Sequence, residues 1–96
     1  MRTSYFLTTK GLNELATANL LINKFMYDCL HQFLCQHWGD ICEEDALLND
    51  QAMKNGERVI ASYNTNLVSD GKIWIIADAE DEEGKRVVTM LLPSEY

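Results

Sequence analysis

The sequence predicts an α+β fold, in which a short N-terminal strand and two main helices precede a C-terminal three-stranded antiparallel meander packed on the longer helix. Two patterns predict this class. Apolar residues recur at helical spacing over about residues 11–55, and they alternate with period two over about residues 57–92. Short polar turns separate the alternating segments, and short connections make neighbouring strands antiparallel.

The composition is that of one folded domain spanning residues 1–96. Hydrophobic residues make up 47% of the 96 residues, and 15 Asp and Glu against 8 Lys and Arg give a net charge of −7. A chain of this length buries about 60% of its unfolded surface, which supports one modest core. Large catalytic assemblies and enclosed cofactor chambers are therefore not expected.

The sequence also predicts a cytoplasmic protein without membrane contact. No apolar run approaches the roughly 18 residues of a membrane span, and the start of the chain lacks the features of a signal peptide. Three cysteines form no disulfide-framework spacing, which is typical of a reducing compartment.

The first elements are short. Residues 3–7 (TSYFL) are aromatic and β-leaning and stop at polar residues 8–11, which predicts a short strand at an edge of the sheet. Leu12, Leu15 and Ala16 then lie at helical spacing, which predicts a helical turn over residues 11–18.

The clearest helical signal predicts a long helix over about residues 19–38. Asn19 is a suitable N-cap, and Gly39 is a natural terminator. Seven apolar residues recur with steps of three and one and so share one helix face. They are Ile22, Phe25, Met26, Cys29, Leu30, Phe33 and Leu34.

A second helix is predicted to start at Asp40. Glu43 follows Asp40 by three residues, which resembles a capping box, and Glu43, Glu44 and Asp45 place negative charge on the first turn, where the helix dipole favours it. The pair Asn55-Gly56 ends the segment. The apolar face of this helix is thin, so we expect it to pack at the edge of the fold.

The meander is predicted from three alternating segments, at residues 59–63, 72–78 and 85–92. An Asp-Gly turn lies between the first two strands, and the acidic turn Glu80–Gly84 lies between the second and third. Pro93 ends the last strand.

The second and third strands of the meander are apolar on both faces, since Trp74 and Ile76 oppose Ile73 and Ile75. One layer of helices covers only one face of an antiparallel sheet. Two interpretations stay open. In the first, the second helix or the N-terminal segment covers the outer face. In the second, an exposed apolar patch pairs two copies or docks a partner.

Neither a metal site, a cofactor nor an active site is expected. Three cysteines and two histidines lie within fourteen residues, but Cys35 and His37 differ by two and would point apart on a helix, and no C-x-x-C or H-x-x-x-H pair is present. Cys42 lies near a predicted helix start, yet its acidic neighbours oppose thiolate formation. No sequence motif of catalysis or phosphate binding is present, so we do not expect an enzyme. The five Cys and His residues are Cys29, His31, Cys35, His37 and Cys42.

The charge points to a protein partner. Phosphate neutralisation by Lys and Arg supplies most non-specific nucleic-acid affinity, and here the basic residues are scattered, so no direct nucleic-acid binding is expected. Excess negative charge steers association with a basic surface. The simpler interpretation, a solvated helix start and a solvated turn, stays open beside it. The two acidic clusters are Asp40, Glu43, Glu44 and Asp45, and Glu80, Asp81, Glu82 and Glu83.

Three segments carry a resemblance to a known family. They are residues 39–63 (GDICEEDALLNDQAMKNGERVIASY), 71–81 (GKIWIIADAED) and 87–96 (VVTMLLPSEY). The chain resembles a family of small acidic proteins encoded on bacterial plasmids and integrative elements, through the pattern WGDICEED…ND…NGERVIASY and the ending LLPSEY. Members often have a shorter turn with a basic residue where this chain has the acidic AEDEEGKR.

The resemblance implies a genomic neighbourhood and no catalytic residue. Small accessory proteins of mobile elements often inhibit host defence, as anti-restriction or anti-CRISPR proteins do, although kinship alone does not fix function. The first hypothesis is therefore a non-enzymatic accessory factor that docks on a host nucleic-acid-handling or defence complex through the acidic clusters, with Trp74 as an apolar anchor. The alternative is a self-associating structural or regulatory module, a homodimer formed through the outer sheet face around Trp74 and Ile76.

Overall fold

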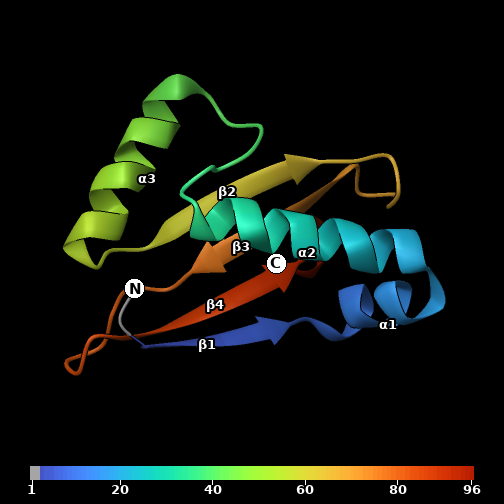
Figure 1. Cartoon of the computed structure of the whole chain (residues 1–96), viewed down its shortest axis with the longest axis horizontal. Coiled ribbons are helices and arrows are strands. Elements are labelled where there is room, and N and C mark those ends of the chain that lie inside the picture. Colours follow the sequence, from blue (N-terminus) through green and yellow to red (C-terminus); the bar gives the residue numbers. More distant parts are fainter. Residues whose placement is uncertain (1–2) are drawn as a thin grey trace.

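A computed structural model describes residues 3–96 and confirms the α+β class, with a short N-terminal strand, three helices and a four-stranded mixed sheet (Figure 1). The elements in chain order are β1 (Thr3–Thr8), α1 (Lys10–Ala18), α2 (Leu20–Leu34), α3 (Glu43–Asn55), β2 (Val59–Asn64), β3 (Lys72–Ala77), β4 (Lys85–Leu91) and the 3₁₀ turn η1 (Pro93–Glu95).

The sheet contains the predicted meander and the N-terminal strand at its edge, but it is mixed rather than antiparallel throughout. Its strand order is β1-β4-β3-β2, and β2, β3 and β4 form the predicted antiparallel meander. The N-terminal strand joins the edge beside β4 and runs parallel to it, with Thr3 opposite Lys85 and Thr8 opposite Met90. Parallel pairing is open to β1 because all the helices and two strands separate it from β4 in sequence.

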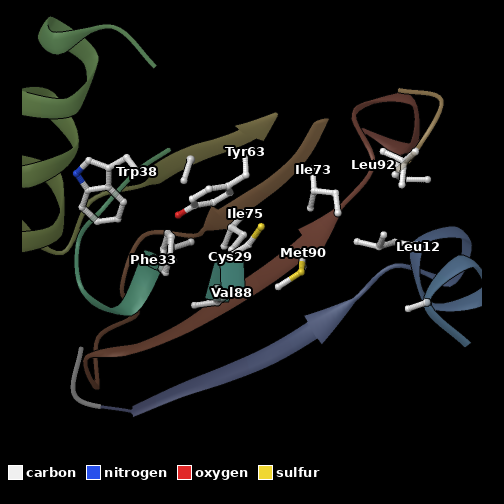
Figure 2. Packing of buried hydrophobic residues seen from close by; sticks show 14 of the residues in the cluster. Leu12, Cys29, Phe33, Trp38, Tyr63, Ile73, Ile75, Val88, Met90 and Leu92 are labelled. Atoms are coloured by element: carbon white, nitrogen blue, oxygen red, sulfur yellow. The ribbon is translucent and has the colours of Figure 1, made fainter. Parts of the chain in front are cut away.

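Helix α2 crosses one face of the sheet and builds the core with it (Figures 1 and 2). Three members of the predicted apolar stripe, Ile22, Cys29 and Phe33, are buried. They pack with inward-facing residues of the strands, since successive strand residues point to opposite faces. The strand residues of this cluster include Val59, Ala61, Tyr63, Ile73, Ile75, Ala77, Val88 and Met90.

The predicted helical turn at residues 11–18 is a helix of its own, so the fold has three helices where the sequence predicted two main ones. Leu12 and Ala16 of α1 are buried in the core.

The chain end returns to the start of α1, where the Glu95 carboxylate accepts hydrogen bonds from the Thr9 hydroxyl (2.6 Å) and the Gly11 N–H (3.0 Å). The bond from Thr9 lowers the pKa of Glu95, and this contact locks the two ends together.

Helix α2 ends four residues earlier than predicted. Asn19 is the N-cap, as expected, and its side chain accepts a bond from the Leu21 N–H. At the other end, Gln36 adopts a left-handed conformation (φ 60°), and the His37 N–H donates to the Gln32 carbonyl. This is a Schellman closure formed around a residue other than glycine. The prediction that the helix runs to Trp38 and ends at Gly39 was therefore wrong.

Helix α3 begins at Glu43, with Cys42 as its N-cap, so the predicted capping box at Asp40 was also wrong. The Asp40 carboxylate instead accepts a hydrogen bond from the Asn64 N–H at 2.8 Å, at the end of β2. The predicted end is confirmed, because Gly56 closes α3 in a left-handed conformation.

Candidate docking surface around α3

The segment between α2 and α3 is pinned to the edge of β2. The Ser62 N–H donates to the Trp38 carbonyl at 3.1 Å, and the Asp40 N–H donates to the Ser62 carbonyl at 2.6 Å. Gly39 lies between them with φ +82°, and a Cβ there would lie 2.1 Å from the Ser62 oxygen. Only glycine allows this close approach, so Gly39 serves the bridge to β2 rather than the end of a helix.

Polar contacts join α3 to this edge. The indole N–H of Trp38 donates to an Asp50 carboxylate oxygen at 2.9 Å, and the Asn49 amide donates to the Ile60 carbonyl at 2.8 Å. Trp38 is buried and meets Phe33 edge-on, with ring centroids 5.2 Å apart (Figure 2). No residue of α3 is itself buried, which confirms that this helix packs at the edge.

Arg86 contacts the end of α3 from the sheet. It is 1% exposed, and its guanidinium nitrogens reach the Met53 sulfur (3.2 Å) and the Glu57 carbonyl (3.1 Å). Its Nε has no hydrogen-bond partner within residues 3–96. Beside Lys85 in sequence it looks like a surface cation, but its place on the inward side of β4, with Val88 and Met90, buries it.

A groove of about 570 Å³ lies between α3 and the outer side of β2 and β3. It brings together three of the predicted partner-binding residues, Asp40, Asp45 and Trp74. Asp45 lies on α3 and Asp40 lies in the segment before it, while Arg58 and Lys72 lie on the strand side, so the groove presents both signs of charge. Its lining consists of Asp40, Ile41, Asp45, Leu48, Asn49, Arg58, Ile60, Ser62, Lys72 and Trp74.

The two predicted acidic clusters lie at opposite ends of α3. Glu43 and Glu44 are exposed on its first turn, beside the groove. At the other end, the Glu80 N–H donates to the Gly56 carbonyl at 2.8 Å, which places the acidic turn next to the C-terminus of α3. A helix of 13 residues is about 20 Å long, so the structure separates the clusters by roughly that length. The remaining turn residues, Asp81, Glu82 and Glu83, are exposed.

The outer sheet face is covered in part by the end of the chain. Ile76 is 6% exposed, and Trp74 is half-buried. The Tyr96 ring meets Trp74 edge-on with centroids 5.7 Å apart, and the Arg58 guanidinium lies over the same ring and donates to its hydroxyl at 2.6 Å. Trp74 therefore offers one open side, toward the groove.

The charge on this side of the molecule is poorly neutralised. Residues 40–57 carry six acidic side chains against one lysine, a net charge of −5, and residues 78–86 carry five against two basic ones, a net charge of −3. Within the described part of the chain, one ion pair forms, between Lys85 and Glu83 at 2.9 Å. The acidic surface is thus available to an external cation.

Two exposed leucines of α3 belong to the candidate docking surface, although they were not among the predicted partner-binding residues. Leu47 and Leu48 are 59% and 61% exposed on α3. Each follows a glutamate of the first turn by four residues, Leu47 after Glu43 and Leu48 after Glu44, so an apolar and an acidic side chain are neighbours on the helix surface. A leucine pair on a helix with too few apolar residues to form a buried stripe was the signal in the sequence.

Of the Cys and His residues, His31 and Cys35 come together one helical turn apart, with Nε2 and Sγ at 4.0 Å, but this pair gains no third ligand from the residues that the structure describes. Among residues 3–96, no group of three or more His, Cys, Asp or Glu side chains is placed to hold a metal ion. All three cysteines are free, and burial raises the pKa of the Cys29 thiol to about 12.

None of the helices in residues 3–96 has the length and hydropathy that a membrane span requires.

Comparisons of the chain with protein families, with curated proteins and with solved structures found no match.

Proposed function

We propose that this protein is a non-enzymatic, protein-binding accessory factor that docks on a basic surface of a cytoplasmic host complex, through α3 and the groove beside it. The observation that carries this proposal is the groove, which places Asp40 and Asp45 beside Trp74, next to the exposed Glu43 and Glu44. A net charge of −5 over residues 40–57, without an internal ion pair there, favours a basic partner.

The side chains of the groove and of the start of α3 indicate which partner side chains would bind there. An apolar side chain of the partner fits between Leu48 and Trp74, while lysines or arginines around it meet the carboxylates at the start of α3. Basic surfaces of this kind belong to proteins that handle nucleic acids, because those proteins neutralise phosphates with Lys and Arg. The sequence resemblance adds an origin in a mobile element and a role as an inhibitor of host defence.

The test is retention of a host complex by the tagged protein from bacterial lysate, followed by binding measurements with the purified partner. We expect one basic complex, retained at low salt and lost as salt rises. Glu43→Gln/Glu44→Gln should weaken binding about tenfold, because it removes two charges from the docking surface.

A matched control separates docking from general charge. Glu14→Gln/Asp28→Asn removes two exposed carboxylates from α1 and α2, and this variant should bind as the natural chain does. Equal loss in both variants, or binding that does not respond to salt, contradicts docking through α3.

A further inference from the structure

The two edge strands of the sheet, β2 and β1, differ in what lies along their outer edges. At the β2 edge, the segment around Gly39 forms a bridge to Ser62, whereas within residues 3–96 β1 has a neighbouring strand only on its β4 side. Three consecutive apolar residues of β1, Tyr5, Phe6 and Leu7, are 53%, 50% and 55% exposed. The strand has no charge and no proline, and its register with β4 is continuous. Such an edge is a template for another strand.

We propose that β1 pairs antiparallel with β1 of a second copy of this chain, about a twofold axis through Phe6. The Thr9 N–H donates to the Met90 carbonyl at 3.1 Å, so the main chain at Thr9 faces β4. Strand alternation then turns the main-chain groups of Phe6 and Thr8 toward the open edge. Phe6 therefore sits where two copies exchange a pair of N–H to C=O bonds across the axis.

The register follows from the side chains. Directly opposite residues of an antiparallel pair share a face of the sheet, so this axis sets Phe6 against Phe6 on the α2 side and Tyr5 against Leu7 on the outer side. Both faces of the new pair are then apolar, as cross-strand pairing favours. Moving the axis to Tyr5 sets Leu7 against Thr3, and moving it to Leu7 sets Tyr5 against Thr9. The axis through Phe6 is thus the one that matches all three apolar residues.

The charge distribution favours a second copy of the chain as the partner at the β1 edge. Each copy carries −7, but residues 3–34 contain two acidic and two basic side chains and are neutral, and α3 lies beyond the far edge of the sheet (Figure 1). The acidic turn ahead of β4 lies at the start of β1, since Thr3 is opposite Lys85. In an antiparallel pair the end of the other β1 comes to this place, and it brings Lys10 toward the acidic turn.

The first experiment traps the register with a disulfide. Phe6→Cys is made in a Cys35→Ser/Cys42→Ser background, which removes the two exposed thiols. Opposite Cα atoms in a hydrogen-bonded antiparallel pair are about 5.5 Å apart, within the range that a disulfide spans. Oxidised glutathione should convert this variant into a covalent dimer of twice the 11.0 kDa chain mass.

The control is Tyr5→Cys in the same background, because this position faces Leu7 of the other copy and not its own equivalent. It should form the covalent dimer much more slowly. Equal rates for the two variants overturn the register, and no dimer from Phe6→Cys overturns the proposal.

The second experiment measures the mass of the uncrosslinked chain by sedimentation. A six-residue strand buries less than the roughly 800 Å² per partner of a standard interface, so we expect a dimer with a micromolar dissociation constant. Phe6→Lys should be a monomer with an unchanged far-ultraviolet circular dichroism spectrum.

Ile60→Lys is the matched control, since Ile60 is 40% exposed on the outer face of the opposite edge strand. This variant should remain a dimer. A natural chain that stays monomeric up to millimolar concentration contradicts the pairing. Loss of the dimer in Ile60→Lys with retention in Phe6→Lys assigns the interface to the outer sheet face instead.

Discussion

Helices α2 and α3 have similar lengths, 15 and 13 residues, but different forces hold them in the molecule. Helix α2 buries Ile22, Cys29 and Phe33 against the sheet. Helix α3 buries no residue completely and is joined to the edge of β2 by bonds from Trp38 and Asn49. Ala46, Ala52 and Met53 of α3 are only partly buried against the core, so this helix keeps most of its surface for other molecules.

The net charge also differs between the part of the chain that contains α2 and the part that contains α3. The part of the chain that contains β1, α1 and α2, residues 3–34, is neutral, whereas residues 40–57 carry −5. Asp40 and Asp50 accept hydrogen bonds within the fold, but like charges on one short segment repel each other, so a net charge of −5 as a whole destabilises the folded state. Under the proposed function, this excess charge acts in contact with a partner of the opposite sign.

The largest predicted effect is on the α2 side. Phe33→Ala removes a completely buried ring from the core and should lower the free energy of unfolding by about 3 to 5 kcal/mol. Urea denaturation measures this loss. The neighbouring Leu34 is 52% exposed, and Leu34→Ala should cost less than about 1 kcal/mol. Similar losses at the two positions would show that α2 is not held by burial.

On the α3 side, the contact of Trp38 with Asp50 should dominate. Asp50→Ala leaves the indole N–H of a buried tryptophan without its acceptor, at a cost of about 1 to 3 kcal/mol. Tryptophan fluorescence during urea unfolding measures the change. Asp50→Asn keeps an oxygen acceptor at the same place and should recover most of the stability. If both variants unfold alike, the hydrogen bond does not hold α3.

Alkaline pH should weaken the α2 side next. Burial raises the pKa of Cys29 from 9.0 to about 12, so above pH 9 the unfolded thiol ionises while the folded one stays protonated. The stability is complete below pH 9 and falls between pH 9 and 12, by about 1 kcal/mol at pH 10 for this group. Burial also raises the pKa of Tyr63, which extends the loss in the same direction.

Urea midpoints between pH 8 and pH 10 follow this loss of stability. Cys29→Ala should have a smaller pH dependence over that range, although its stability at neutral pH is lower. An unchanged pH dependence in Cys29→Ala would contradict the assignment to this thiol.

The smallest effect is predicted for the acidic first turn of α3. Glu44→Gln removes one favourable interaction with the helix dipole and should cost about 0.3 to 0.5 kcal/mol at low salt and less at high salt. Glu82→Gln, in the turn after β3, should change the stability by still less. A loss above 1 kcal/mol at Glu44 would mean that its charge serves folding rather than docking.

The sequence predicted the elements that depend on local pattern. The alternation of β2, β3 and β4 and the left-handed stop at Gly56 are confirmed, and so is the stripe of α2 except for Leu34, which is 52% exposed. The segment Trp38–Asp40 was assigned to a helix end and a capping box, because an apolar Trp followed by Gly and Asp is typical of those features. Its bonds to Ser62 and Asn64 are long-range, and no local pattern contains them.

The same limit applied to the candidate site. The sequence identified Asp40, Asp45 and Trp74 as partner-binding residues, but as members of separate elements. Their meeting in one groove depends on the bridge at Gly39, which sets α3 beside β2. The sequence also does not show how far the acidic turn lies from the start of α3. The two clusters are equally acidic, and the distance between them depends on the path of the chain. The cover that Tyr96 gives to Trp74 likewise needs the complete fold.

Hydrogen exchange of the backbone amides tests the central contrast between α2 and α3 most directly. Amides of α2 should exchange only through global unfolding, because its residues form the core. Amides of α3 should exchange at least about tenfold faster, because this helix buries no residue completely and can open by losing a few polar contacts and the partial burial of Ala46, Ala52 and Met53, while α2 and the sheet stay packed. Protection of α3 equal to that of α2 would contradict the account, since it would make α3 part of the same cooperative core.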